Sequence, residues 1–289
     1  MTPFGKSVRK GQRASDAAVH LFLGVLSILW LIPFVWLLAQ SFRDGKGQFI
    51  TTFFPTRYTL QNYLRLFTNR SVINFPRMFG NTLFVAVCTC ILSTFFVLAV
   101  AYSTSRLRWK MRKAYVNLAM IINLFTGFMS MIAVYFLLKA LGMTQGDRVY
   151  AALIICFSSG SATGFFIMKG YMDTIPKALD EAASLDGCTR WQIFTKITLP
   201  LCKPMIVYQI ITSFMIPWID FVFAKIIVGA QSDYFTVSIG LFYMLDKEYV
   251  YDWFPRFCAG AVLVSIPIAL LFLYTQRFYQ EAMSGAVKG

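Results

Sequence analysis

Residues 173–204 read DTIPKALDEAASLDGCTRWQIFTKITLPLCKP, and this polar segment interrupts a chain that is almost continuously apolar on both sides. Thr174 is a residue type that caps a helix start, and Pro176 suits a first turn, where its missing N–H costs nothing. Residues 177–185 then predict a short amphipathic helix. One face carries Ala178, Ala182 and Leu185, and the opposite face carries Lys177, Glu181 and Ser184.

The second half of the polar segment predicts another short helix. Gly187 stands where a left-handed helix stop is needed. Thr189, with Gln192 three residues later, has the pattern of a capping box that starts a helix again. We expect this helix to end before Pro200 and Pro204, because proline cannot continue the helical hydrogen-bond ladder. Two short helices joined by a glycine corner have the form of a docking part.

The composition places the whole chain in a membrane. Of its 289 residues, 57% are hydrophobic and only 14% are charged, whereas a soluble domain carries about a quarter charged residues. Apolar runs of about 20 residues recur along the chain, as in an all-α integral membrane protein. The net charge of +14 does not indicate nucleic acid. The basic residues gather beside the apolar runs, as at 106–113, where they set topology and contact lipid headgroups.

We predict six transmembrane helices. They cover residues 17–38, 81–102, 114–138, 149–168, 205–228 and 257–274. The first is too long for a signal peptide and lacks a small-residue cleavage site, so we expect it to be retained. The basic cluster after the second span places that loop, the polar segment and both termini in the cytoplasm.

Three parts follow from this topology. Residues 1–76 hold the cytoplasmic N-terminus, the first span and an extracellular loop. Residues 77–275 hold the remaining five spans, with the polar segment between spans four and five. Residues 276–289 form a cytoplasmic tail.

Two features inside the spans leave alternatives open. The small residues at 158–164, with Gly160 and Gly164 four apart, favour close helix packing, or else a loosened helix that lines a path. Asp220 is the one carboxylate well inside a span, and it is either paired within the bundle or a ligand contact or proton relay. Trp218 beside it fills space or stacks on a sugar. These two residues are the candidates for the substrate path.

Catalytic and metal-binding patterns are absent from the sequence. It contains no phosphate-binding GxxxxGK[ST] motif, no Ser-His-Asp arrangement and no metal-ligand spacing. The six cysteines form no CxxC pair, so we interpret them as small hydrophobic residues. His20, the single histidine, opens the first span without a nearby carboxylate, which favours a structural role.

The polar segment carries a specific motif. It consists of Glu181-Ala182-Ala183, then Asp186-Gly187, and later Ile197, Leu199-Pro200 and Pro204. This pattern resembles the EAA loop of bacterial ABC importer permeases. The resemblance implies the type I ABC importer fold and a coupling helix that docks on a separate ATPase. It assigns ATPase coupling to Glu181, Ala182, Ala183, Asp186, Gly187, Leu199 and Pro200.

A narrower resemblance adds residues 165–171 and the ending at 284–289, which together are similar to the maltose-type (MalG-like) sugar permeases. It implies oligosaccharide cargo such as maltodextrin, a second related permease subunit, and a solute-binding protein outside the bacterial plasma membrane. It also implies a dimer of ATPase subunits that use ATP and Mg, so that this chain binds no cofactor and is not itself an enzyme. The tail residues Val287, Lys288 and Gly289 then become a second ATPase contact.

Other functions stay open at this point. An ABC permease for a polyol or glycerol-phosphate would show the same motif. The run 215–218 departs from the family pattern, so direct substrate contact by this chain stays open as well. A secondary transporter driven by protons or sodium would need paired intramembrane acids and an inverted repeat, which the sequence lacks. A membrane-embedded enzyme would need a catalytic constellation, which is also missing.

Overall fold

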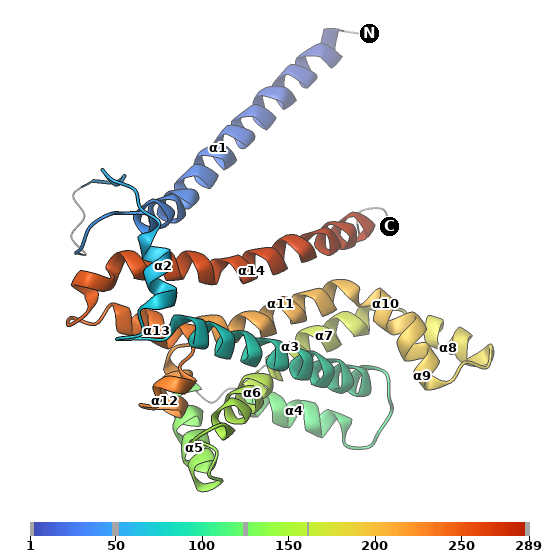
Figure 1. Cartoon of the computed structure of the whole chain (residues 1–289). Helices are drawn as coiled ribbons and strands as arrows, with labels where there is room; N and C mark the ends of the chain where they lie inside the picture. The colour runs from blue at the N-terminus through green and yellow to red at the C-terminus, as the bar shows by residue number, and fades with distance from the viewer. Residues whose placement is uncertain (1–2, 48–51, 124–126, 161, 287–289) are drawn as a thin grey trace. The chain divides into compact units, whose positions relative to one another are not determined.

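The computed structural model describes residues 3–47, 52–123, 127–160 and 162–286. Within these ranges the chain forms helices joined by connections and contains no β-strand (Figure 1). The α-helices are α1 (Pro3–Ser41), α2 (Gln61–Thr68), α3 (Phe75–Ser105), α4 (Arg112–Asn123), α5 (Gly127–Ala140), α6 (Arg148–Gly160), α7 (Ala162–Thr174), α8 (Ala178–Leu185), α9 (Arg190–Ile193), α10 (Leu199–Leu201), α11 (Lys203–Ile219), α12 (Val222–Val228), α13 (Val237–Met244) and α14 (Val250–Ala286). A π-helical turn, η1 (Phe194–Thr198), and a 3-10 turn, η2 (Ser232–Tyr234), complete the set.

Contacts divide the chain into two compact units. The first contains residues up to Thr68 together with residues 244–262. Inside it, the buried Asn62 side chain donates hydrogen bonds to the carbonyls of Ser41 and Arg43, at 3.0 and 2.8 Å. These bonds hold the end of α1 against α2. The second unit contains residues 69–243 and the chain from Leu263 on, and it includes the polar segment.

The described residues include four helices that are long and apolar enough to cross a membrane. They are Asp16–Ser41, Phe75–Ser105, Arg148–Thr174 and Val250–Gln276, and the helix pair Arg190–Leu201 and Lys203–Ile219, bent by 77°, adds a fifth if it counts as one span. The predicted all-α membrane fold is therefore confirmed, whereas four or five of the six predicted spans pass as membrane-crossing helices among the described residues. The predicted span 114–138 corresponds to α4 and α5, and residues 124–126 between them lie outside the described residues.

Helix α3 is the centre of the second unit and packs against α11, α7 and α6. Its buried side chains include the small polar residues Thr82, Thr89 and Ser93, whereas Ile91 and Phe95 are exposed. In a soluble protein this arrangement would be inverted. It is normal in a bilayer, because lipid tails are as apolar as leucine and small residues let helices approach closely.

Gly164 shows how close this approach is. A Cβ atom at Gly164 of α7 would lie 2.4 Å from Oε1 of Gln209 in α11. Gln209 is itself buried, and its Nε2 donates to Ser93 Oγ of α3 at 2.9 Å. Helices α3, α7 and α11 therefore meet at a polar contact where a side chain on α7 would displace the end of Gln209. This geometry supports the packing interpretation of the small-residue run, whose residue 161 lies outside the described residues.

The predicted fifth span, residues 205–228, is not one continuous helix. Helix α11 ends at Ile219 and α12 begins at Val222. Pro217 removes one backbone donor from the last turn of α11. The Asp220 carboxylate then accepts a hydrogen bond from the N–H of Ala224 at 2.8 Å, so it satisfies the start of α12. Proline and aspartate together produce the break.

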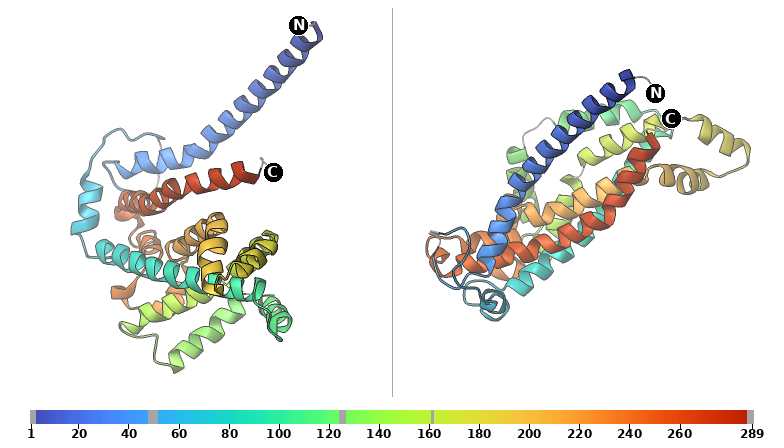
Figure 2. Two further views of the ribbon diagram at one scale, coloured as in Figure 1. Left: turned by 90° about the vertical axis from the view of Figure 1, so that its right-hand side faces the viewer. Right: turned by 90° about the horizontal axis from the view of Figure 1, so that it is seen from above.

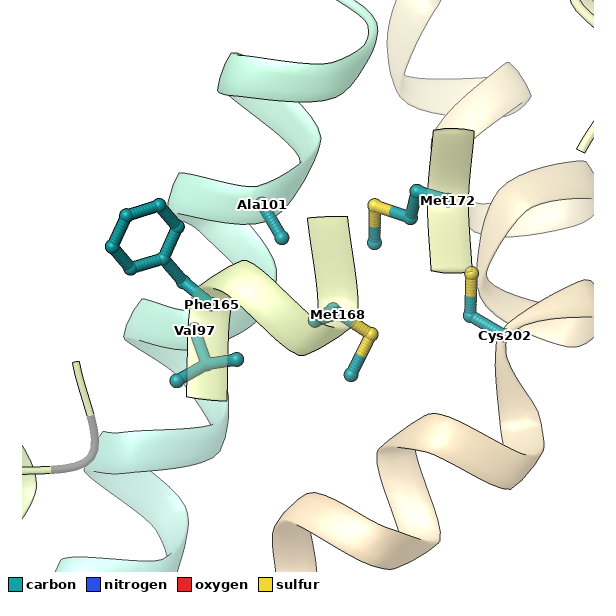
Figure 3. Packing of buried hydrophobic residues seen from close by; sticks show 6 residues of the cluster. All are labelled: Val97, Ala101, Phe165, Met168, Met172 and Cys202. Carbon is teal, nitrogen blue, oxygen red and sulfur yellow. The ribbon is translucent and has the colours of Figure 1, made fainter. Parts of the chain in front are cut away.

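A buried apolar cluster holds both ends of the polar segment. Figure 3 shows Val97 and Ala101 of α3, Phe165, Met168 and Met172 of α7, and Cys202 at the start of α11. All six side chains are buried. The polar segment leaves α7 and returns to α11 at this cluster, so its two ends are anchored to the same stretch of α3. Helices α8 and α9 extend beyond the ends of α7 and α10 in Figure 1 and in the right-hand view of Figure 2.

Candidate functional site in the polar segment

Helix α8 begins later than the sequence predicted. Thr174 is the last residue of α7, and its Oγ1 donates to the carbonyl of Tyr171 at 2.7 Å. The predicted cap at Thr174 is therefore wrong, because the side chain turns back into the preceding helix. Lys177 is the N-cap of α8 and makes no side-chain capping bond. Asp180 and Glu181 in the first turn instead stabilise the positive end of the helix dipole.

The glycine corner is confirmed. Gly187 has φ of +80°, in the left-handed region where a side chain is strained. The N–H of Cys188 donates to the carbonyl of Ala183 at 3.0 Å, and the N–H of Gly187 donates to Ser184 at 3.1 Å. This pair of bonds is a Schellman motif, which satisfies the last carbonyls of α8 and stops the helix at Asp186.

The capping box at the start of α9 is confirmed as well. The N–H of Thr189 donates to Oε1 of Gln192 at 2.8 Å, and the N–H of Gln192 donates to Oγ1 of Thr189 at 3.3 Å. Both ends of the corner are thus closed by hydrogen bonds between neighbouring residues. A corner closed in this way behaves as a rigid elbow between α8 and α9.

The second helix does not end before Pro200, as the sequence predicted. The π turn at η1 follows α9 directly, and α10 then contains Pro200 in its first turn. A π turn widens the helix by one residue, so the ladder is already interrupted when proline arrives. The sharp bend comes at Cys202 instead, and Pro204 occupies the first turn of α11, as proline prefers.

The two faces of α8 differ in what they contact. Ala183 is buried, and so is Ile193 on α9. The side chains of Leu185 and Trp191 are exposed at 90% and 70%. Large apolar side chains at the tip of a polar segment mark a surface that another protein covers. Glu181, Ala182, Asp186 and Gly187 are also exposed around this tip.

The connection to the body of the unit runs through Arg106, which the sequence analysis assigned only to topology. Its side chain is 4% exposed and pairs with Asp180 of α8, with Nη1 and Oδ2 3.2 Å apart. Its Nη2 donates to the carbonyls of Met172 and Ile175, at 2.7 and 3.0 Å. No local sequence pattern marks this residue, because its partners lie 66 or more positions away.

A second set of contacts surrounds this arginine. Ser105 Oγ donates to Asp173 Oδ1 at 2.6 Å, and Lys169 pairs with the other oxygen of Asp173. Tyr102 donates to the carbonyl of Arg190 at 3.3 Å and lies against the ring of Phe194, with centroids 4.6 Å apart. The last turn of α3 therefore contacts α7, α8, α9 and the π turn.

The other residues that the sequence analysis predicted as site residues do not belong to the exposed tip. Leu199 and Pro200 belong to α10, beside Leu201, whose carbonyl accepts a bond from Tyr171 at 3.2 Å. Asp220 and Trp218 lie at the opposite end of α11 from the polar segment. Trp218 is 3% exposed and touches the rings of Phe79 and Phe214. The tail residues Val287, Lys288 and Gly289 lie outside the described residues.

The fold and the elbow define a helical membrane protein with an exposed tip, and comparison with known proteins identifies its class. Residues 98–283 match the model of the Binding-protein-dependent transport system inner membrane component family. This range includes the end of α3 and the whole polar segment. The chain belongs to this family of ABC importer permease subunits, as the EAA-like motif predicted.

Relatives cover almost the entire chain. The Galactooligosaccharides transport system permease protein GanQ of Bacillus subtilis (strain 168) is 31% identical over 272 residues, covering 93% of this chain and 94% of the relative. The Maltose/maltodextrin transport system permease protein MalG of Vibrio vulnificus (strain YJ016) is 30% identical and covers 99% and 98%. The predicted resemblance to MalG-like permeases is thus confirmed.

A solved structure supports the fold. A chain of a bacterial ABC transporter involved in the import of the acidic polysaccharide alginate superposes with a TM-score of 0.75. The match covers 93% of this chain and 98% of that chain, at 21% sequence identity. The type I importer arrangement predicted from the polar segment is consistent with this match.

Proposed function

We propose that this chain translocates oligosaccharides, of the maltodextrin kind or similar, as the permease subunit of an ATP-driven importer. Relatives named for galactooligosaccharides and for maltose or maltodextrin align over nearly its full length. Other ABC cargo such as a polyol or glycerol-phosphate is the alternative, and it receives no support from these relatives.

The observation that carries the proposal is the exposed tip of a rigid elbow. Leu185 and Trp191 are apolar and exposed, while Gly187 and the capping box at Thr189 fix the angle between the helices that bear them. A docking part must be stiff, because a flexible one would absorb the motion it has to transmit. This geometry supports the coupling role of Glu181, Ala182, Asp186 and Gly187, which are exposed at the tip. The coupling role of Ala183, Leu199 and Pro200 is proposed from the motif alone.

The partners follow from this role. The elbow docks on one subunit of an ATPase dimer, which binds and hydrolyses ATP with Mg. Glu181 is exposed on α8, where it can pair with a basic residue on the wall of the receiving groove. The chain itself holds no cofactor and performs no catalysis. A second, homologous permease completes the pathway, and a solute-binding protein delivers the sugar.

The orientation is set by charge. The basic residues at 106–113 lie at the same end of α3 as the polar segment, and the positive-inside rule places that end in the cytoplasm of a bacterium. Both termini are then cytoplasmic in the plasma membrane. The tail residues Val287, Lys288 and Gly289 form a second contact with the ATPase in this arrangement.

Transport proceeds by alternating access. Closure of the ATPase dimer around ATP moves the groove that holds the elbow, and the spans tilt from inward-open to outward-open. Asp220 and Trp218 are candidates for the substrate path. The hydrogen bond of Asp220 to the start of α12 and the ring contacts of Trp218 favour a structural role for both.

A charge reversal tests the proposal. Glu181→Lys, in the complex with its second permease and ATPase subunits, is expected to abolish sugar uptake and ATPase co-purification while the chain stays inserted in the membrane. Gly187→Leu, which strains the corner, has the same expected effect. Glu248→Lys reverses an exposed charge outside the polar segment and leaves ATPase co-purification unchanged. Normal ATPase binding and uptake in Glu181→Lys would overturn the docking assignment.

A further inference from the structure

Arg106 joins three separate segments at a single guanidinium group. It lies at the C-cap of α3, where its backbone N–H bonds to the carbonyl of Tyr102. Its side chain reaches the carbonyls of Met172 and Ile175, at the end of α7 and just beyond it. It also pairs with Asp180 in the first turn of α8.

This arrangement requires arginine. The guanidinium is planar and presents its donors as a rigid fork, so it can bind two carbonyls with one nitrogen and face a carboxylate with another. A lysine ammonium is a compact point charge and cannot hold this geometry. Because the arginine side chain is almost fully buried, its charge must be matched by the helix-end carbonyls and by Asp180.

The ion pair is only partly hydrogen-bonded. Nη1 and Nε of Arg106 and Oδ1 of Asp180 are buried without a hydrogen-bond partner among the described residues. The pair is therefore held by charge at 3.2 Å and not by a fully aligned bond. Charge attraction tolerates small rotations that would break an aligned hydrogen bond. The pair can thus stay closed while α8 turns relative to α3.

Movement of α8 reaches α3 by two routes. One is direct, through the Arg106–Asp180 pair, and the other passes through the elbow to α9, where the Arg190 carbonyl accepts a bond from Tyr102. The tip of α8, with Leu185, is exposed, and on its other side Ala183 is buried and Asp180 pairs with Arg106. The path from Asp180 leads straight to Arg106 and so to α3, the helix that packs against α7, α6 and α11.

We propose that the Arg106–Asp180 pair is the joint through which displacement of α8 moves α3, and that it sets how tightly ATP hydrolysis is coupled to transport. Arg106 is a positioning residue, since it acts through α8 and touches neither nucleotide nor sugar. The inference rests on the proposed function, because it assumes that α8 docks on the ATPase.

The test uses the complete complex in proteoliposomes with its solute-binding protein and radiolabelled maltodextrin. In Arg106→Gln, we expect the ATPase subunits to stay bound and ATP hydrolysis to continue, while sugar uptake per ATP falls about ten-fold. Arg108→Gln removes the same charge from an exposed neighbour in the same loop and leaves the ratio unchanged. An unchanged ratio of sugar uptake to ATP hydrolysis in Arg106→Gln would overturn the proposal that this pair is the joint.

Asp180→Asn provides a second variant with the shape of the native side chain. If the pair acts as one joint, Asp180→Asn uncouples transport as Arg106→Gln does, and the double variant is no worse than Arg106→Gln alone. A double variant with multiplied losses would show that the residues act separately. Loss of uptake only in proportion to lost assembly, in both single variants, would show a purely structural role and would also overturn the proposal.

Hydrogen exchange separates failure of the joint from failure of the proposed function. In the wild-type complex, ATP is expected to change amide exchange in α8 and in the last turn of α3. In Arg106→Gln, the change in α8 persists and the change in α3 falls. An undiminished change in α3 of the variant overturns the joint alone. A wild-type chain that binds no ATPase overturns the proposed function.

Discussion

The middle of α3 and the tip of the polar segment both expose large apolar side chains, for opposite reasons. Ile91 and Phe95 lie on a long apolar helix whose buried face is small and polar, as at Thr89. Leu185 and Trp191 lie on short helices surrounded by charged residues. Lipid accounts for the first surface, because a span must present hydrocarbon to hydrocarbon. For the second surface we propose a protein partner.

The comparison predicts opposite effects of the same substitution. Ile91→Asp places a charge on the lipid face of α3, which costs about 2.5–3.5 kcal/mol at the centre of a span, so membrane insertion falls. Leu185→Asp leaves insertion intact and weakens ATPase binding, because a charge enters an apolar contact. Membrane-fraction yield and ATPase co-purification measure the two effects. Equal insertion of both variants would contradict the assignment of the α3 face to lipid.

A second prediction compares two glycines of α7. Gly164→Ala pushes a Cβ against Gln209, whose bond to Ser93 is buried, and breaking a buried hydrogen bond costs about 1–3 kcal/mol. Gly170 has open space around it, so Gly170→Ala stabilises the helix by about 0.5–1 kcal/mol. Thermal unfolding of the purified complex in detergent measures both changes. A stabilising Gly164→Ala would show that α7 and α11 are farther apart.

The third and smallest prediction compares two threonines in and beside the polar segment. Thr189→Ala removes the capping box of α9 and destabilises the elbow by about 1 kcal/mol. Thr174→Ala removes only a bond back to Tyr171 within α7, so amide exchange in α8 stays unchanged. Exchange of the α9 amides, measured with and without each substitution, tests the pair. Faster amide exchange in α8 of Thr174→Ala would instead support the helix cap that the sequence predicted at Thr174.

The success of the sequence analysis depended on the range of each interaction. The capping box and the glycine stop close within five residues, so the pattern of residue types was enough to place them. The predicted helix cap at Thr174 was wrong because two local hydrogen bonds compete for one hydroxyl, and the structure has the bond into α7. The predicted helix end before Pro200 was wrong because the π turn before this residue changes the register of the backbone hydrogen bonds.

The face that α8 turns inward was also beyond the sequence. Periodicity separated Ala178, Ala182 and Leu185 from the charged face, but it did not identify which side would be covered. The structure buries Ala183 and directs Asp180 to Arg106. Asp180, which the periodicity assigned to neither face, became the inner contact, because a buried cation stood opposite to it.

By itself, the sequence determined that the chain lies in a membrane, that a polar elbow interrupts its spans, and where that elbow turns. Hydropathy and short-range hydrogen bonds decide these features, and both are properties of neighbouring residues. Only the tertiary structure decided that α11 and α12 part at Asp220, that Gly164 lies against the side chain of Gln209, and that Arg106 holds α8 to α3. These depend on groups brought together from distant positions, where packing and buried charge act only once the helices have met.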